Sequence, residues 1–213
     1  MEHSALVIIS YLAGSFPSGF IVSKLFSTKD IRNVGTKQIG AANVTRQLGF
    51  RHGALSLSLD ILKALVPMAI IHYALRQPYW VTAICGCTMV FGHDFSIFLS
   101  YQGGEGLATT MAVLFFLSPS RFLLMFPFAI LTLIFSGYVT VAGVVQLWGY
   151  AVICWSTGAP MPVVYASLGL VLLALVKQTP WIMEFSPYDF MKPDFVAPNT
   201  KAVAAVEIKH QRQ

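Results

Sequence analysis

The sequence predicts an all-α, polytopic integral membrane protein with about seven transmembrane helices, and three observations support this expectation. Of its 213 residues, 56% are hydrophobic and 11% are charged, and the mean hydropathy is +0.68. Soluble domains carry roughly 25% charged residues, so water does not solvate most of this surface. The apolar residues form runs near the roughly 20 residues that a membrane-spanning helix needs. The basic residues gather between these runs.

Seven apolar runs are the expected spans. The first, residues 4–26, is too long for the apolar core of a signal peptide and lacks a small-residue cleavage site, so we expect a retained helix. The fourth, residues 107–117, is short for a span. It crosses if the bilayer thins or if neighbouring helices pack around it. The remaining runs are residues 54–75, 78–100, 121–135, 139–157 and 161–176.

The distribution of basic residues predicts the orientation. Of 14 Lys and Arg, six lie between Lys24 and Arg51 and five lie from Lys177 onward. Because such residues favour cytoplasmic loops, we expect the N-terminus outside and the C-terminus in the cytoplasm. The membrane domain then covers residues 1–185, with cytoplasmic loops at 27–53, 100–106 and 136–140, and a polar tail follows at 186–213. No basic soluble face is left for nucleic acid, so no such partner is expected.

The cysteines do not indicate a metal site. Cys85, Cys87 and Cys154 all lie in apolar runs, and the Cys-Gly-Cys spacing does not suit a metal knuckle because no His pair follows. We therefore expect small buried hydrophobic side chains, with no metal and no cofactor.

The 27–53 loop has the composition of an anion site. Small residues at Gly35, Gly40 and Ala41 let backbone N–H groups approach an anion closely. Arg32, Lys37 and Arg46 add charge, and arginine suits bidentate contact with phosphate. The alternative is a basic loop that lies on anionic lipid headgroups.

Ionisable residues also lie inside the expected spans. Asp60 and Lys63 are three positions apart and share one helix face. Such groups are expensive within a membrane and usually point into a polar site, although a structural ion pair that fixes helix packing is the alternative. His93, beside Asp94, closes the third run, and it is either a base or a hydrogen-bonded group at the interface.

A glycine-rich turn at residues 102–106 precedes the fourth run. Glycines before a helix N-terminus expose N–H groups to an anion at the positive end of the helix dipole. Glu105 stands at that place and can satisfy the helix end itself. Two like charges about 4 Å apart cost about 4 kcal/mol at an effective dielectric near 20, so Glu105 also opposes an incoming phosphate.

Taken in order, five segments resemble the bacterial acyl-phosphate:glycerol-3-phosphate acyltransferase family. The first is Gly-Ser-Phe-Pro-Ser-Gly at 14–19, and the second is Gly-Thr at 35–36 with Gly-Ala-Ala-Asn-Val-Thr-Arg-Gln-Leu-Gly at 40–49. The others are Asp-x-x-Lys at 60–63 with Pro67, Gly-His at 92–93 with Gly-Gly-x-Gly-x-Ala-Thr at 103–109, and Ser-Gly-Tyr at 136–138.

The resemblance implies a small seven-span enzyme of the bacterial inner membrane. Such enzymes move an acyl chain from acyl phosphate to glycerol 3-phosphate and make lysophosphatidic acid, without coenzyme A. The implied partners are membrane lipids and the two substrates. The implied catalytic residues are Thr36, Asn43, Lys63 and His93. The implied substrate- or phosphate-binding residues are Arg32, Gly35, Gly40, Ala41, Arg46, Gly103, Gly104, Gly106, Thr109, Ser136 and Lys177.

Departures from the family pattern favour a second interpretation. The family's Gly-Ser-Gly-Asn-Pro-Gly is Gly-Thr-Lys-Gln-Ile-Gly at 35–40, and its two turn lysines are Gln102 and Glu105. Of the family's Arg-His-x-x-Asn-Ile, Lys177 keeps only the charge. The alternative is a catalytically inactive paralogue that acts as a lipid-binding or structural subunit of a larger membrane complex with protein partners. The sequence leaves open whether the protein is an active enzyme.

Overall fold

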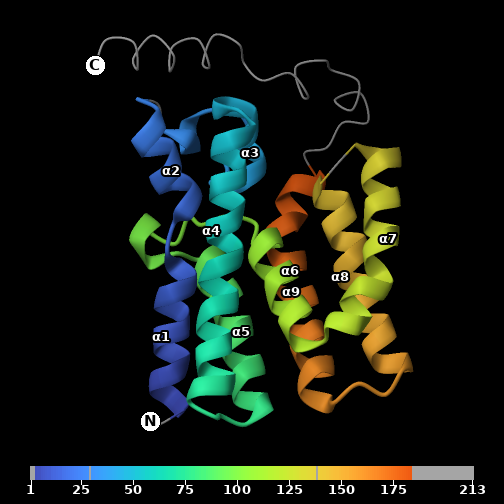
Figure 1. The fold of residues 1–213 in the computed structure, drawn as a ribbon. Helices are drawn as coiled ribbons and strands as arrows, with labels where there is room; N and C mark the ends of the chain where they lie inside the picture. The colour runs from blue at the N-terminus through green and yellow to red at the C-terminus, as the bar shows by residue number, and fades with distance from the viewer. Residues whose placement is uncertain (1–2, 29, 138, 184–213) are drawn as a thin grey trace. The chain divides into compact units, whose positions relative to one another are not determined.

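The computed structural model describes residues 3–28, 30–137 and 139–183, and all regular structure in these ranges is helical. The α-helices are α1 (His3–Ser15), α2 (Ser18–Phe26), α3 (Ala41–Leu48), α4 (Phe50–Ala69), α5 (Tyr79–Asp94), α6 (Leu107–Leu117), α7 (Pro119–Ser136), α8 (Val139–Ser156) and α9 (Met161–Met183) (Figure 1). Two 3-10 turns, η1 (Ile31–Asn33) and η3 (Ile97–Leu99), and one π-helical turn, η2 (Ile70–Ala74), complete the set. The expected tail at 186–213 lies outside the described residues.

Four of the described helical stretches are long and apolar enough to cross a membrane. They are His3–Phe26, Phe50–Ala74, Tyr79–Leu99 and Pro119–Ser136. Three shorter apolar helices, Leu107–Leu117, Val141–Ser156 and Met161–Lys177, accompany them. The four long and three short stretches coincide in position with the expected apolar runs, and the all-helical prediction is confirmed.

The first expected span is interrupted. α1 ends at Ser15 and α2 begins at Ser18, with Pro17 between them at φ −90° and ψ 68°. Proline has no N–H for the preceding turn, and it disfavours helical backbone at the residue before it. The prediction of one continuous helix over residues 4–26 was therefore wrong at this point.

The 27–53 loop contains more regular structure than we predicted. Helix α3 forms within it, and α4 already begins at Phe50. Val44 and Leu48, four residues apart, are buried on one face of α3, whereas Arg46 is partly exposed. This apolar face is only one turn long, which is too short for a hydrophobic pattern to stand out in a polar segment.

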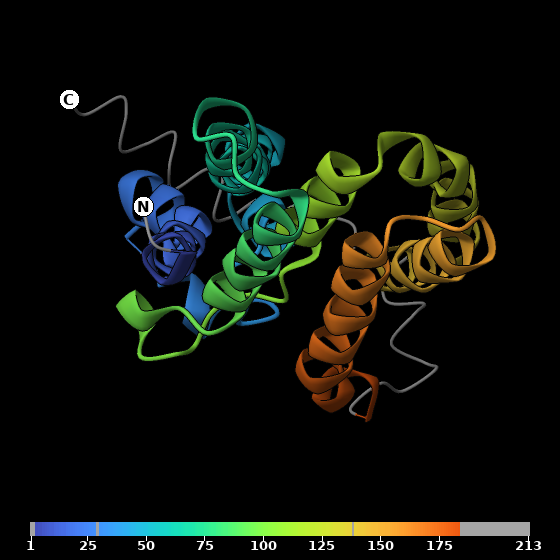
Figure 2. The ribbon, with the colours of Figure 1, turned by 90° about the horizontal axis from the view of Figure 1, so that it is seen from below.

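The chain divides into two compact units. The first comprises Ile61–Pro180 with the segment up to Phe16, and the second comprises Pro17–Asp60 with the segment from Trp181. Within the first unit, α1 lies along α5 and α7 lies along α8 (Figures 1 and 2). Its buried core includes Met68, Met89 and Tyr150.

Buried polar side chains in the first unit bond to main-chain carbonyls. Tyr150 on α8 donates its hydroxyl to the Leu114 carbonyl at 3.0 Å, and Gln146 donates its amide to the Phe122 carbonyl at 3.0 Å. A polar group in hydrocarbon needs a partner inside the protein. These bonds therefore fix α8 against α6 and α7.

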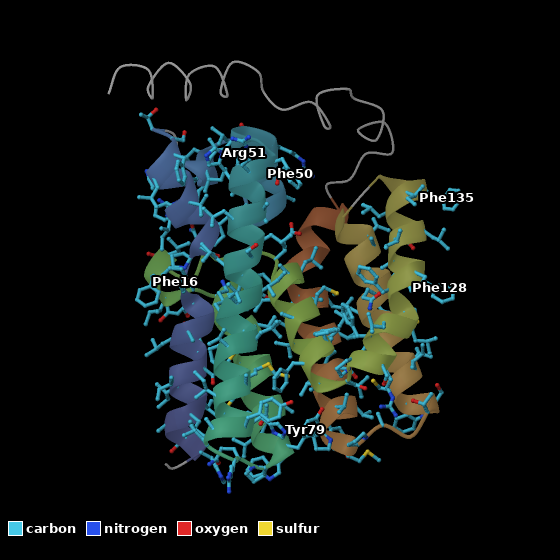
Figure 3. All side chains as sticks on the ribbon, viewed as in Figure 1. Phe16, Phe50, Arg51, Tyr79, Phe128 and Phe135 are labelled. Atoms are coloured by element: carbon cyan, nitrogen blue, oxygen red, sulfur yellow. The ribbon has the colours of Figure 1, made fainter. Side chains whose placement is uncertain are left out.

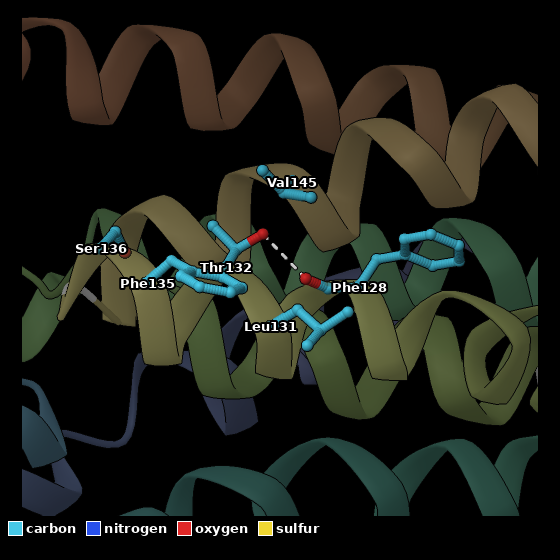
Figure 4. Close-up of a pocket in the computed structure, with 6 residues that line it drawn as sticks. All are labelled: Phe128, Leu131, Thr132, Phe135, Ser136 and Val145. Carbon is cyan, nitrogen blue, oxygen red and sulfur yellow. Dashed lines mark hydrogen bonds between the residues drawn. The ribbon is translucent and has the colours of Figure 1, made fainter.

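One face of α7 is open to its surroundings. Figure 3 shows the Phe128 and Phe135 side chains projecting away from α7, and they are 55% and 86% exposed. A shallow groove of about 460 Å³ is lined by Phe128, Leu131, Thr132, Phe135, Ser136 and Val145 (Figure 4). The Thr132 hydroxyl donates a hydrogen bond to the Phe128 carbonyl at 2.8 Å. The groove thus offers mainly hydrocarbon surface, which suits contact with lipid chains.

The contact between α1 and α5 depends on Gly14. A Cβ at this position would lie 2.0 Å from the Met89 carbonyl oxygen, whereas a Cβ at Gly169 on α9 would meet nothing within 4 Å. We expect Gly14→Ala to lower the stability by about 1–3 kcal/mol, since the helices must separate. The matched control Gly169→Ala should raise it by about 0.5–1 kcal/mol. Thermal unfolding in detergent measures both, and equal midpoints for the two variants would contradict the packing argument.

Candidate functional site

The side-chain amide of Asn43 organises the loop before α3. Its Nδ2 donates to the carbonyl oxygens of Gln38 (2.8 Å), Val34 (3.1 Å) and Ile31 (3.3 Å), and its Oδ1 accepts from the Thr36 N–H (3.2 Å). Asn43 is 1% exposed. Its amide is therefore used by the loop itself.

Two residues of this loop have left-handed backbone. Gly35 has φ +58°, and a Cβ there would lie 2.3 Å from Asn43 Oδ1, so both the dihedral angle and the space require glycine. Lys37 has φ +59°, which is strained for a residue with a side chain. Lys37 stands where the family pattern has glycine, so this departure has a backbone cost.

The N-terminus of α3 presents backbone donors. Gly40 is the N-cap, and its carbonyl accepts from the N–H groups of Asn43 and Val44. The N–H groups of Ala41 and Ala42 precede the first donors of the helical ladder, as at every helix start. The helix dipole makes this end positive, and a Cβ on Gly40 would meet nothing within 4 Å. An anion can therefore approach these amides.

Arg32 is committed to a neighbour. Its guanidinium donates to Asp30 Oδ1 through Nε at 3.0 Å and to Oδ2 through Nη2 at 2.8 Å, and it lies 4.8 Å from the Phe20 ring centroid. These side-chain hydrogen bonds hold the pKa of Asp30 well below its usual range, and the same contact raises the pKa of Arg32. Of the arginines expected to bind phosphate, Arg46 lies on α3 itself, in its last turn.

A buried carboxylate anchors α2 to α4 within the second unit. The Ser18 hydroxyl donates to Asp60 Oδ1, and both residues are 1% exposed. One residue later, a Cβ at Gly19 would lie 1.9 Å from the Ile39 carbonyl oxygen. The Ser-Gly pair at 18–19 therefore lets α2 approach both α4 and the loop.

A second polar cluster lies in the first unit, around Lys63. The Lys63 Nζ lies 2.9 Å from the Phe16 carbonyl oxygen and 2.7 Å from His93 Nδ1. His93 is 5% exposed. The ammonium group is thus bound by the residue that follows α1 and by the last turn of α5.

The glycine-rich turn packs directly on this last turn of α5. The Gly104 N–H donates to the His93 carbonyl at 3.1 Å, and the Gly103 N–H donates to the Asp94 carbonyl at 3.2 Å. A Cβ at Gly104 would lie 2.4 Å from His93 Nε2. Gly106, with φ +67°, is the N-cap of α6. Glu105 therefore lies one residue before the cap of this helix.

Asp94 is a buried acid that sequence reasoning did not select. It is 1% exposed, its Oδ1 has no hydrogen-bond partner among the described residues, and a Cβ at Gly106 would lie 2.3 Å from that oxygen. Lys63, Lys177 and Glu105 are the charged groups within its electrostatic reach. The available signal was a carboxylate inside the apolar run at 78–100, nine positions before Gly103.

The structure distributes the predicted site residues over the two units. The second unit holds Arg32, Gly35, Thr36, Gly40, Ala41, Asn43 and Arg46. The first unit holds Lys63, His93, Gly103, Gly104, Gly106, Thr109, Ser136 and Lys177. In the first unit, Ser136 ends α7, and Lys177 Nζ lies 4.7 Å from the Phe95 ring centroid. Each unit therefore combines glycine-lined backbone with cationic side chains.

Comparisons with known proteins identify relatives over most of the chain. The family model described as glycerol-3-phosphate acyltransferase matches residues 4–185. The glycerol-3-phosphate acyltransferase of Aquifex aeolicus (strain VF5) is 34% identical over 176 residues, which cover 83% of this chain and 90% of that protein. Glycerol-3-phosphate acyltransferase 2 of Bacillus anthracis is 35% identical over 175 residues, covering 80% and 87%.

Two solved structures have the same fold. Both are of PlsY, described as an integral membrane glycerol 3-phosphate acyltransferase. Its glycerol 3-phosphate form has a TM-score of 0.78 and 31% identity, covering 86% of this chain and 92% of that one. Its lysophosphatidic acid form has a TM-score of 0.76 and 29% identity, covering 86% and 91%. The predicted fold class, an all-α integral membrane protein, is confirmed.

The strained backbone at Lys37 leads to a stability prediction. Lys37→Gly should stabilise the protein by about 0.5–1 kcal/mol, because glycine relieves the left-handed strain and loses part of the gain as chain entropy. Lys37→Ala removes the same charge and side chain but keeps the strain, so its stability should stay within about 0.5 kcal/mol of wild type. Thermal unfolding midpoints that rise equally in both variants would show that charge, and not backbone strain, is responsible.

The Asn43 hydrogen bonds lead to a second prediction. Asn43→Asp keeps an acceptor for the Thr36 N–H but loses both donors, so buried carbonyls are left unpaired. We expect a loss of about 2 kcal/mol or more, and faster amide exchange at Thr36. The matched control is Asn33→Asp, because Asn33 is exposed in the same unit. A control that is as destabilised as Asn43→Asp would show that the added charge, and not the lost donors, is the cause.

Proposed function

The chain belongs to the glycerol-3-phosphate acyltransferase family, and we infer from this membership that it is a membrane enzyme of phospholipid biosynthesis that acylates glycerol 3-phosphate. The match over residues 4–185 carries this conclusion. The relatives are named as enzymes, so they do not favour the alternative of an inactive subunit in a larger complex.

We propose acyl phosphate as the acyl donor and lysophosphatidic acid as the product. The glycerol 3-phosphate and lysophosphatidic acid forms of PlsY support the acceptor and the product. In the reaction, a hydroxyl oxygen of glycerol 3-phosphate attacks the acyl carbonyl carbon. The bond from that carbon to the phosphate oxygen breaks, and the departing phosphate takes the hydroxyl proton. Such chemistry needs positioning and charge stabilisation more than a protein nucleophile.

We propose that the second unit binds a phosphate group at the N-terminus of α3. The N–H groups of Ala41 and Ala42 are the donors, Arg46 supplies charge from α3, and Thr36 supplies a hydroxyl. Backbone donors at a helix start favour a phosphate through both hydrogen bonds and the helix dipole. Gly35 and Asn43 act by shaping the loop.

We propose that the first unit supplies a hydroxyl and charge through Thr109, Lys63 and Lys177, and that Gly103, Gly104 and Gly106 act by shaping the 103–106 turn. The Thr109 hydroxyl supports this assignment, because it is buried without a hydrogen-bond partner among the described residues. The reaction has two phosphate-bearing reactants, and each unit offers glycine-lined backbone beside cations. We infer no role for Arg32 beyond its pairing with Asp30, which uses two of its guanidinium N–H donors and its charge.

We propose the bacterial inner membrane as the location, since the relatives are bacterial and the structural neighbour is an integral membrane protein. Seven spans, with the N-terminus outside and the C-terminus in the cytoplasm, agree with the basic segments at 24–51 and after Lys177. The loops at 27–53, 100–106 and 136–140 then face the cytoplasm.

A direct assay tests the function. The purified protein in lipid receives palmitoyl phosphate and glycerol 3-phosphate, and released phosphate and lysophosphatidic acid are measured. The relative from Aquifex aeolicus is the positive control. Turnover comparable to the control supports the proposal. A folded protein without turnover beside an active control would contradict it and would favour the inactive paralogue.

The charge of Glu105 leads to a kinetic prediction. Glu105 lies within electrostatic reach of Lys177, so removing its charge leaves more of the lysine's field for a phosphate. We expect Glu105→Lys to lower the KM for a phosphate-bearing substrate by at least about fivefold, with Glu105→Gln in between.

The control for net charge is Gln77→Lys, which changes the net charge by the same amount as Glu105→Gln. Gln77 lies in the turn between η2 and α5, where its amide donates to the Leu75 carbonyl at 3.2 Å. Its KM should match that of wild type. An equal decrease in KM for Gln77→Lys and Glu105→Gln would show a global charge effect and contradict the local one.

A further inference from the structure

We propose that His93 is a positioning residue: it holds the Lys63 ammonium and the 103–106 turn, and its imidazole is not the base of the acyl transfer. The observation behind this proposal is a single buried ring that contacts a cation through one nitrogen and faces glycine backbone with the other. The proposal rests on the proposed function only where activity serves as the readout.

The contact with Lys63 fixes which nitrogen carries the proton. The Lys63 Nζ lies 2.7 Å from His93 Nδ1, and an ammonium group has donors but no acceptor. His93 Nδ1 therefore accepts, and the proton of the neutral ring is on Nε2. A base needs an accessible lone pair. In His93 the lone pair points at Lys63, and the other nitrogen already carries a proton.

His93 also contacts the glycine turn. A Cβ at Gly104 would lie 2.4 Å from Nε2, and the His93 carbonyl accepts from the Gly104 N–H at 3.1 Å. The ring is 5% exposed, so little of it is open to a substrate. Both the side chain and the main chain of His93 therefore contact the 103–106 turn.

Lys63 is also bound by the carbonyl of Phe16, at 2.9 Å from Nζ. Two acceptors on different segments, Phe16 after α1 and His93 on α5, define the position of one ammonium group. Since a lysine side chain has many rotamers, losing the imidazole acceptor should free Lys63 and reduce its contribution to charge stabilisation.

His52 supplies a matched contrast in the same chain. Its Nδ1 lies 2.7 Å from the Leu48 carbonyl oxygen. A carbonyl only accepts, so His52 must carry its proton on Nδ1. The two histidines are therefore expected in opposite tautomers.

The first experiment does not depend on activity. The protein, labelled with ¹⁵N in histidine and held in nanodiscs, is studied by NMR correlation of ring protons with ring nitrogens. His93→Asn and His52→Gln assign the signals by their loss. We expect the Nε2–H tautomer for His93 and the Nδ1–H tautomer for His52. An Nδ1–H tautomer or an imidazolium at His93, at the pH of the assay, would overturn the proposal.

The second experiment compares two substitutions by activity. The amide of asparagine places an oxygen near the position of Nδ1, whereas the amide of glutamine reaches the position of Nε2. We expect His93→Asn to keep kcat within about threefold of wild type, and His93→Gln to lose about tenfold or more, the effect of one hydrogen bond to a charged group. If His93 were the base, both would lose about 10²–10⁴-fold, and the proposal would fail.

The two experiments separate this proposal from the proposed function. Wild-type protein without turnover would contradict the acyltransferase assignment and leave the tautomer result to decide the role of His93. If His93→Asn does not fold, as judged by its elution and thermal unfolding, His93→Gln assigns the His93 signal and the wild-type tautomer decides.

Discussion

The need to satisfy polar groups without water is the constraint on which the rest of this structure depends. An unpaired polar group in hydrocarbon costs several kcal/mol. The end of α5 meets this need by bonding to the end of α1. Tyr11 donates to the Phe95 carbonyl at 2.8 Å, and Ser96 donates to the Ser15 carbonyl at 2.6 Å. The Lys63 ammonium joins the same region through the Phe16 carbonyl and the His93 imidazole, so a main-chain and a side-chain acceptor position this charged group.

Glycine makes this arrangement sterically feasible. A Cβ at Gly92 would lie 2.3 Å from the Tyr11 carbonyl oxygen, and one at Gly103 would lie 1.9 Å from the His93 carbonyl oxygen. Close packing at the end of α5 therefore requires glycine, which explains why Gly92 and Gly103 stand in the motifs there. At the start of α3, where a Cβ on Gly40 would meet nothing within 4 Å, glycine instead leaves the helix N–H groups open to approach.

Much of the fold could be predicted from the sequence, because apolar runs report directly on membrane spans. The run at 107–117 coincides with α6 residue for residue. Local chemistry that breaks or adds structure was harder to predict. Pro17 divides the first span, and α3 forms in a segment with only one apolar turn. For the candidate site, the motifs located the glycines and Lys63. They did not show that Asp30 pairs with Arg32, which depends on the local conformation of η1, or that Asp94 is buried, which depends on tertiary packing.

Phosphate binding by the backbone N–H groups at the start of α3 is the interaction on which the proposed role of the second unit depends. The most direct test is an experimental structure of the protein with glycerol 3-phosphate bound. We expect a phosphate within hydrogen-bond distance of the Ala41 and Ala42 amides, with Asn43 still bonded to the loop carbonyls. A phosphate held by side chains alone, away from these amides, or an Asn43 amide turned from the loop to the ligand, would contradict it.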